Sequence, residues 1–127
     1  MTTRDEQLRD ERDTRILAVI RALVPGEVVT YGDIAHDAGY PKLSRLVGRL
    51  LAITDDDLPW WRVVNSAGRL VPGHEREQTA LLKAERVLIV GGRVKSAQLG
   101  RFAVRIRPAE PPAARSMKKR SASRRNP

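Results

Sequence analysis

The sequence predicts an α+β fold that is mainly helical and of the winged-helix type, in which a helix-turn-helix precedes a small hairpin. Three observations support this fold class. Apolar residues recur at helical spacing before residue 53, a glycine-containing turn near residue 39 divides two short helical segments, and a Gly91-Gly92 pair separates two short apolar runs. We expect one domain over residues 1–107 and a disordered basic tail over residues 108–127, where little can be buried.

The first helix is expected over roughly residues 6–23. An apolar stripe recurs there at helical spacing, and Pro25-Gly26 ends the segment. The stripe is expected to face the core, and its members are Ile16, Leu17, Val19, Ile20 and Leu23.

The helix-turn-helix is expected next. Thr30 is a good N-cap for a short helix that ends near Asp37, and Gly39 supplies the turn. Pro41 suits the first turn of a second helix, which runs to about residue 53, because the N–H that proline lacks would have no intrahelical partner there. The buried set of this second helix is expected to be Leu43, Leu46, Val47, Leu50 and Leu51.

A glycine at position 48, inside the second helix, calls for an explanation because it costs about 1 kcal/mol relative to alanine. Close approach of another backbone, that of DNA included, is one explanation. Packing against the first helix of the pair is the other, and both stay open at this point.

The C-terminal part of the domain is expected to combine extended segments with one helix. Residues 58–65 contain both tryptophans and are predicted to be extended, so that Trp60 and Trp61 point to opposite faces. A helix is expected from about residue 75 to 86, and then a hairpin over 87–94 and an edge strand over 102–107. The helix is expected to face the core with Ala80, Leu81 and Leu82.

Composition excludes several classes of function. The sequence has no cysteine, which rules out a disulfide framework, a thiolate nucleophile and cysteine-ligated zinc. Its two histidines, His36 and His74, lack metal-binding spacing, so we expect no metal and no cofactor. Because no apolar run is long enough to span a membrane and no secretory signal is recognisable, we expect a cytoplasmic protein without membrane contact.

The charge pattern favours a nucleic-acid partner. Residues 101–127 contain nine Lys or Arg and one Glu, a net +8 of the total of +9, so the tail is expected to add salt-sensitive phosphate contacts, with a solubilising role as the alternative. Within the nearly neutral remainder, Lys42, Arg45 and Arg49 lie in a stretch without acids, and three aspartates follow at 55–57. This segregation is typical of a DNA-binding surface, although a solvated helix face has the same pattern.

Four segments carry a resemblance to a known family. They read GEVVTYGDIA at 26–35, GYPK at 39–42, RLVG at 45–48 and PWWRVV at 59–64. In this order and spacing, over about residues 16–90, the chain resembles the DNA-binding domain of O6-alkylguanine-DNA alkyltransferases. In those enzymes the last segment reads Pro-Cys-His-Arg-Val, and the cysteine accepts the alkyl group. Trp60 stands at the cysteine position, as in the alkyltransferase-like proteins, and an indole nitrogen has no nucleophilic lone pair to offer, so the resemblance implies a non-enzymatic protein.

The resemblance implies that the second helix of the pair enters the minor groove of DNA. Arg45 then corresponds to the arginine that fills the space of an extruded nucleotide, and Tyr31 to the tyrosine that presses on the adjacent phosphate. Gly48 fits the close approach that this groove demands. The implied DNA-binding set is Thr30, Tyr31, Lys42, Arg45, Gly48 and Arg49.

The resemblance also implies a pocket for the extruded base. Trp61 departs from the family's histidine. Glu85 matches the carboxylate that orients that histidine, and without the histidine a structural hydrogen bond or a helix-face charge is an equally open role. The residue that reads the O6 position stays open, with Arg69 and Arg76 as candidates besides the loop around His74. The implied pocket set is Trp60, Trp61, Arg62, Val63, Val64, Gly73, His74 and Glu85.

The function implied by the resemblance is recognition of O6-alkylguanine in double-stranded DNA. The protein would flip the damaged base, hold it without chemistry and mark it for nucleotide excision repair proteins, as a nucleoid-associated monomer. The alternative is a winged-helix DNA-binding or regulatory protein without lesion specificity. An enzyme with another nucleophile such as Ser66 is disfavoured, because no His–acid pair is positioned to activate it.

Overall fold

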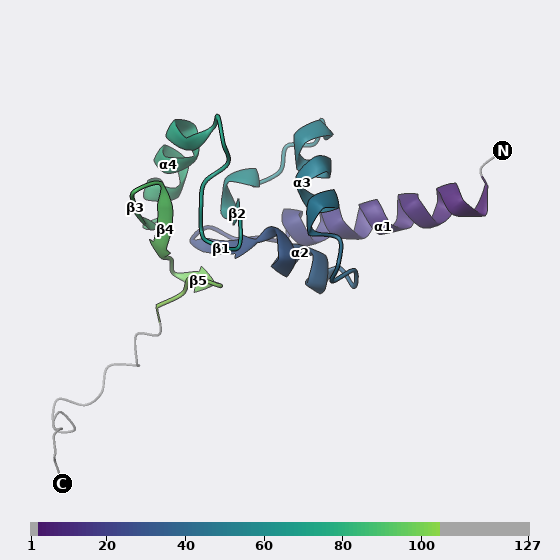
Figure 1. The fold of residues 1–127 in the computed structure, drawn as a ribbon, viewed down its shortest axis with the longest axis horizontal. Coiled ribbons are helices and arrows are strands. Elements are labelled where there is room, and N and C mark those ends of the chain that lie inside the picture. The colour runs from purple at the N-terminus through teal and green to yellow at the C-terminus, as the bar shows by residue number, and fades with distance from the viewer. Residues whose placement is uncertain (1–2, 105–127) are drawn as a thin grey trace, which may run out of the picture.

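The computed structural model describes residues 3–104, so the expected tail at 108–127 and the end of the last expected strand lie outside the described residues. The chain forms an elongated α+β domain (Figure 1). Its elements are α1 (Arg4–Arg21), β1 (Glu27–Thr30), α2 (Tyr31–Asp37), α3 (Ser44–Ile53), the 3₁₀ helix η1 (Trp60–Arg62), β2 (Val63–Val64), α4 (Glu75–Ala84), β3 (Leu88–Val90), β4 (Arg93–Ser96) and β5 (Leu99–Gly100).

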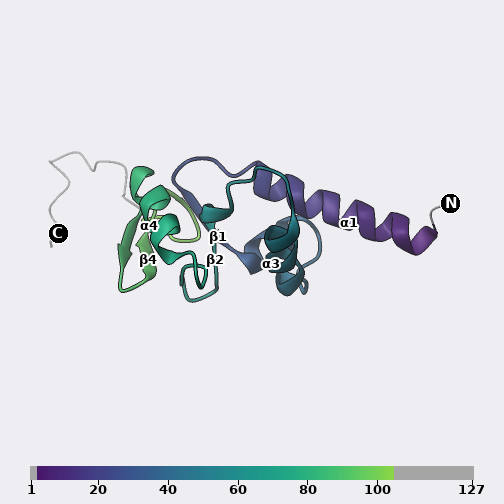
Figure 2. The ribbon, with the colours of Figure 1, turned by 90° about the horizontal axis from the view of Figure 1, so that it is seen from above.

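Two apolar clusters divide the domain. The first lies among α1, α2 and α3 and includes Ile16, Ile20 and Val47. The second lies beneath α4 and the β3–β4 hairpin and includes Leu82 and Val94. We call the parts around these clusters the helical half and the C-terminal half. They lie at opposite ends of the domain, with β1 and β2 between them (Figures 1 and 2).

A small parallel sheet joins the halves. Its strand order is β2-β1-β5, with Val29 opposite Val63 and Thr30 opposite Val64. Because successive side chains of a strand point to opposite faces, Val29 packs in the first cluster and Val28 in the second. The sequence did not predict this sheet, since strands of two to four residues are too short to show an alternating pattern.

The expected β3–β4 hairpin is confirmed. Val90 pairs with Arg93 across a turn made by Gly91 and Gly92, whose φ angles are +60° and +75°. A left-handed turn of this kind favours glycine, because a Cβ would clash with the backbone. Within the described residues, the predicted strand at 102–107 is reduced to a bridge between Ala97 and Ala103.

Two helix predictions need correction. The second helix of the pair begins at Ser44 and not at Pro41, because the Leu43 N–H donates to the Tyr40 carbonyl and closes a separate turn first. On α4 the buried residues are Gln78 and Leu82, whereas Ala80 is exposed. The short helix α2 and its N-cap Thr30 are confirmed.

The segment with the two tryptophans is a 3₁₀ turn and not an extended strand. The Trp60 N–H donates to the Leu58 carbonyl, and the Arg62 N–H donates to the Pro59 carbonyl. The two indoles do not point to opposite faces as expected, because their ring centroids lie 6.2 Å apart with the planes at 88° and form an edge-to-face pair. The extended segment was predicted wrongly because residues of high β propensity do not reveal a 3₁₀ turn.

Candidate nucleic-acid interface and adjoining pocket

The start of α2 is fixed by a reciprocal cap. The Thr30 hydroxyl accepts a hydrogen bond from the Asp33 N–H, and the Asp33 carboxylate accepts one from the Thr30 N–H, both at 3.0 Å. Arg101, which follows β5, also donates to Asp33, and this bond holds the pKa of Asp33 below its ordinary value. Thr30 is buried and its hydroxyl belongs to the cap, so the structure places it inside the fold and not on the predicted DNA-binding surface.

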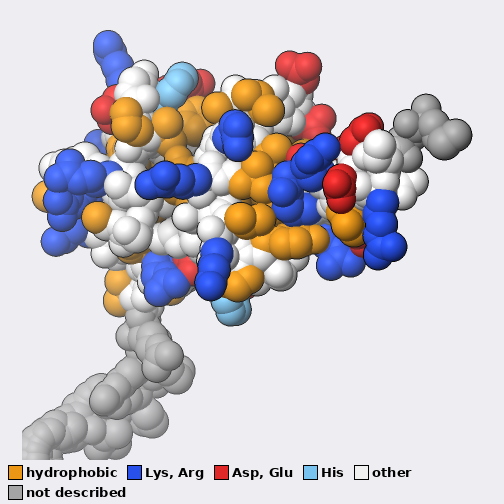
Figure 3. Space-filling model, turned by 45° about the vertical axis from the view of Figure 1, so that its right-hand side comes forward, with side chains coloured by type: hydrophobic (Ala, Val, Ile, Leu, Met, Phe, Trp, Pro, Cys, Tyr) orange, Lys and Arg blue, Asp and Glu red, His pale blue; other side chains and the backbone are white. Residues whose placement is uncertain are grey.

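The second helix of the pair presents the predicted cations to solvent. Arg45 and Arg49 on α3 are exposed, as is Lys42 in the preceding turn. Lys and Arg side chains are spread across the face shown in Figure 3. This arrangement leaves the basic side chains of α3 accessible to a phosphate backbone.

Gly48 lies between these cations. A Cβ added there would approach the ring of Tyr31 only to 3.7 Å, which is ordinary van der Waals contact. The packing of α3 on α2 therefore does not require glycine at this position. Of the two explanations for Gly48, the structure leaves the close approach of a molecule from outside.

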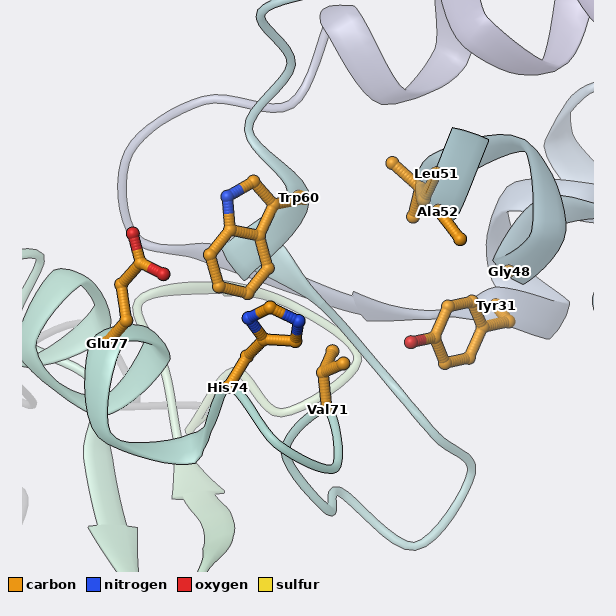
Figure 4. A pocket seen from close by; sticks show the side chains of 8 residues that line it. All are labelled: Tyr31, Gly48, Leu51, Ala52, Trp60, Val71, His74 and Glu77. Atoms are coloured by element: carbon orange, nitrogen blue, oxygen red, sulfur yellow. The ribbon is translucent and has the colours of Figure 1, made fainter. Parts of the chain in front are cut away.

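A pocket of about 310 Å³ opens beside α3. Figure 4 shows α3 along one side, Trp60 and the loop before α4 on the other, and the ring of Tyr31 projecting between them. We call this cavity the Trp60 pocket, and its lining residues are Tyr31, Gly48, Leu51, Ala52, Trp60, Val71, His74 and Glu77. A cavity of this size with aromatic walls and a few polar groups is typical of a small-molecule or base site.

Two aromatic neighbours set the position of the Trp60 ring. The His74 ring lies at 5.7 Å between centroids with an interplanar angle of 65°, and the Trp61 ring lies at 6.2 Å edge-on. Such edge-to-face pairs each contribute about 0.5–1.5 kcal/mol beyond area burial.

Behind the pocket, the Glu85 carboxylate accepts hydrogen bonds from three residues in two distant parts of the chain. Its carboxylate accepts from the Trp61 indole N–H (2.8 Å), from Nε and Nη2 of Arg62 (3.0 and 2.7 Å) and from the Gly26 N–H (2.9 Å). Arg62 also donates to the Leu23 carbonyl at 2.9 Å. Burial raises the pKa of Glu85, but these hydrogen bonds outweigh it and leave the pKa below its ordinary value. Of the roles left open for Glu85, the structure shows the structural hydrogen bond.

Gln78, which the sequence did not point to, supports the backbone around the pocket through hydrogen bonds. It is fully buried, its amide donates to the carbonyls of Trp61 and Val63, and its carbonyl accepts from the Val71 N–H at 2.7 Å. It thereby ties η1 to the loop that carries Val71. The available signal was its position four residues before Leu82, on the same helix face.

The structure brings together part of the predicted pocket set. Trp60 and His74 line the Trp60 pocket, and Tyr31 and Gly48 join them from the predicted DNA-binding set. The other six predicted pocket residues do not line it. Val63 and Val64 are buried in the core, and Gly73 lies in a turn. The remaining three, Trp61, Arg62 and Glu85, form the hydrogen-bond network behind the pocket. Leu51, Ala52, Val71 and Glu77 were not anticipated.

The candidate O6-reading arginines lie elsewhere. Arg69 lines a second, adjoining cavity of about 220 Å³ that shares Tyr31 and Val71 with the first. Arg76 lines neither. Among residues 3–104, no group of acidic or histidine side chains is arranged to hold a metal ion, and no helix is long and apolar enough to cross a membrane.

Comparison with known families decides the affiliation. A family model described as the DNA-binding domain of 6-O-methylguanine DNA methyltransferase matches residues 11–87. The chain belongs to this family. The α+β fold class and the resemblance seen in the sequence motifs are both confirmed.

Three named relatives show how similar the chain is to other proteins of this family. The chain is 36% identical over 100 residues to a DNA base-flipping protein of Vibrio parahaemolyticus, a match that covers 76% of this chain and 93% of that protein. It is 39% identical over 87 residues to a DNA base-flipping protein of Escherichia coli, covering 65% and 67% of the two chains. It is 33% identical over 86 residues to alkyltransferase-like protein 1 of Schizosaccharomyces pombe, covering 63% and 80%.

Solved structures give the same grouping. The S. pombe alkyltransferase-like protein in complex with DNA containing O6-carboxymethylguanine superposes with a TM-score of 0.58 at 32% identity, covering 64% of this chain and 81% of that one. The Mycobacterium tuberculosis O6-methylguanine methyltransferase gives 0.52 at 28% identity, covering 58% and 47%. The relatives that are matched over most of their own length are named as base-flipping and alkyltransferase-like proteins.

Proposed function

We propose that this chain recognises O6-alkylguanine in duplex DNA, turns the damaged nucleotide out of the helix and holds it in the Trp60 pocket without chemical change. One observation carries the proposal. The pocket opens directly beside the exposed cationic face of α3, so a base extruded next to this helix would meet an aromatic cavity of suitable size. The names of the relatives and the lesion-containing DNA bound to the S. pombe protein support it.

In the proposed complex α3 lies in the minor groove. Arg45 enters the duplex in place of the extruded nucleotide, Gly48 allows the DNA backbone to come close, and Lys42 and Arg49 contact phosphates. Extrusion costs a few kcal/mol of unstacking, and a damaged base that pairs poorly costs less, which by itself favours the lesion.

Tyr31 is proposed to contact the phosphate beside the extruded nucleotide. Burial raises the pKa of Tyr31 above 10.0, so its hydroxyl is protonated at physiological pH and can donate a hydrogen bond to an anionic oxygen. Tyr31 lines both cavities, which supports a role for it in guiding the base into the Trp60 pocket.

Inside the pocket, Trp60 is proposed to provide an aromatic surface for the base. His74 and Tyr31 supply hydrogen-bond donors, and Glu77 supplies an acceptor for an exocyclic amine. With an indole where a nucleophile would be needed, the alkyl group stays on the DNA.

We further propose that the monomeric complex flags the site for nucleotide excision repair, and that the basic residues after 104 add salt-sensitive phosphate contacts in the nucleoid.

The test compares labelled duplexes that differ only by one O6-methylguanine, titrated with protein and followed by fluorescence anisotropy. We expect tighter binding to the damaged duplex, and equal affinities would contradict lesion recognition. A radiolabelled methyl group is expected to remain on the DNA.

Arg45→Ala is the sharper form of this test, with Arg49→Ala on the same helix as its matched control. Arg45→Ala is expected to reduce the preference for the damaged duplex, whereas Arg49→Ala is expected to weaken binding to both duplexes alike. If Arg45→Ala also weakened both alike, the chain would be a winged-helix DNA-binding protein without lesion specificity.

A further inference from the structure

Trp61 lies outside the Trp60 pocket and is held more firmly than Trp60. Its indole N–H donates to Glu85 at 2.8 Å, and the guanidinium of Arg62 lies 5.1 Å from its ring centroid. Its backbone carbonyl accepts from the fully buried Gln78 at 3.1 Å. Its ring packs against the second cluster. The edge, the face and the backbone of Trp61 are therefore all fixed.

Trp60 is held differently. Within residues 3–104 no hydrogen bond fixes its indole N–H, and two aromatic rings, those of His74 and Trp61, lie beside it. Of its two aromatic neighbours, His74 is exposed at the start of α4, whereas Trp61 is tied to the Glu85 network. Of the two neighbours of the Trp60 ring, Trp61 is therefore the one that is held rigidly.

We infer that Trp61 is a positioning residue, which transmits the rigidity of the Glu85–Arg62 pair to Trp60 and so keeps the wall of the pocket oriented before DNA arrives. This inference rests on the proposed function, since it assigns Trp61 a part in discriminating the damaged base. A wall that is already in place avoids the ordering cost that a mobile ring would impose on binding.

A purely structural role would predict something else. If Trp61 only filled space in the second cluster, replacing it would lower the free energy of unfolding but leave the motion of Trp60 and the lesion preference unchanged. Phe102 packs against the same cluster, so Phe102→Leu serves as the matched control for lost packing there.

Trp61→Phe is the decisive variant. It keeps an aromatic ring but removes the N–H donor, while Glu85 retains its bonds from Arg62 and Gly26, so the domain is expected to fold. The chain has two tryptophans, so labelling with 5-fluorotryptophan gives two fluorine resonances, and Trp61→Phe leaves that of Trp60 alone.

The first measurement is fluorine relaxation of Trp60 in the free protein. We expect the Trp60 resonance to show faster motion or exchange in Trp61→Phe than in the wild type, and no such change in Phe102→Leu. Unchanged relaxation in Trp61→Phe would overturn the inference. Should this variant fail to fold, Glu85→Gln, which weakens the acceptor but keeps Trp61, is expected to loosen Trp60 to a smaller extent, and an unchanged Trp60 there would overturn it equally.

The second measurement is the ratio of affinities for the damaged and undamaged duplexes. In Trp61→Phe this ratio is expected to fall roughly three- to tenfold, the range that corresponds to ordering one mobile side chain on binding, and to hold in Phe102→Leu. If the affinity ratio fell without any change in Trp60 motion, the positioning role of Trp61 would be refuted and the proposed function would stay intact. A wild-type ratio of one would refute the proposed function, and the relaxation measurement would still decide the role of Trp61.

Discussion

The two halves of the domain are stabilised by different kinds of contact. In the helical half, apolar side chains such as Ile16 and Ile20 are fully buried. The cap of α2 is local, because the Thr30 hydroxyl accepts from the Asp33 N–H three positions along the chain. In the C-terminal half, polar side chains reach across the chain, as Glu85 does to Gly26 over 59 residues. The helical half is built to tolerate gradual change, whereas the C-terminal half depends on a few buried polar groups whose partners must all be present.

The largest effect is expected for Glu85→Ala. Arg62 is only 10% exposed, and removing its partner leaves a buried charge uncompensated, which costs about 3–5 kcal/mol. Urea unfolding followed by circular dichroism measures the loss. Ile20→Val in the helical half is the matched comparison and is expected to cost only about 0.5–1.5 kcal/mol. Equal losses would remove the contrast between the halves.

Gln78→Ala is expected to come next. It removes a hydrogen-bond partner from the carbonyls of Trp61 and Val63 and from the Val71 N–H. Leaving the Val71 N–H donor unsatisfied costs about 1–3 kcal/mol. Hydrogen exchange at the Val71 amide is expected to accelerate more than the global loss explains. Thr79→Ala, one position along α4, is expected to leave that amide protected.

Thr30→Ala tests the helical half. Losing the N-cap is expected to cost about 1 kcal/mol, and Thr30→Ser, which keeps the hydroxyl, is expected to restore most of it. Because Thr30 is buried in the cap, DNA affinity measured on the folded protein is expected to stay at the wild-type value. A loss of affinity without a loss of stability would return Thr30 to the DNA-binding surface.

The smallest expected effect is the pH dependence of stability that Glu85 causes, which is absent at neutral pH and appears only in acid. The pKa of Glu85 is lowered in the folded state, so its contribution is complete above the ordinary value of 4.5 and is lost as the pH falls through the lowered value. Stability measured by urea unfolding at successive pH values is therefore expected to decline below about 4.5. In Glu85→Gln this decline is expected to be shallower, and an unaltered slope would mean that Glu85 carries none of it.

Sequence reasoning succeeded where the determinants are local. The Thr30 cap, the length of α2 and the glycine turn of the hairpin all depend on residues within a few positions of one another. The family motifs also singled out Trp60, which lines the pocket in the structure.

It failed where partners are distant in the chain. Only the spacing from Leu82 marks Gln78 as buried, and the polar partners of its amide are distant in the chain. An acid such as Glu85 is interpreted as a helix-end charge until Arg62 and Gly26 are seen beside it. The pocket lining from α3 was missed for the same reason, since Leu51 and Ala52 read as continuations of an apolar stripe and their exposure depends on where η1 lies. The short parallel strands had no pattern to detect.

The adjacency of β1 and β2 has a consequence for how the family can diversify. Tyr31 follows the end of β1 and η1 leads directly into β2, so main-chain pairing between Thr30 and Val64 sets the spacing between the Tyr31 hydroxyl and the Trp60 indole. Under the proposed function, a change in the side chains around the cavity would alter which adduct is accepted, while the point at which a nucleotide is delivered would stay constant.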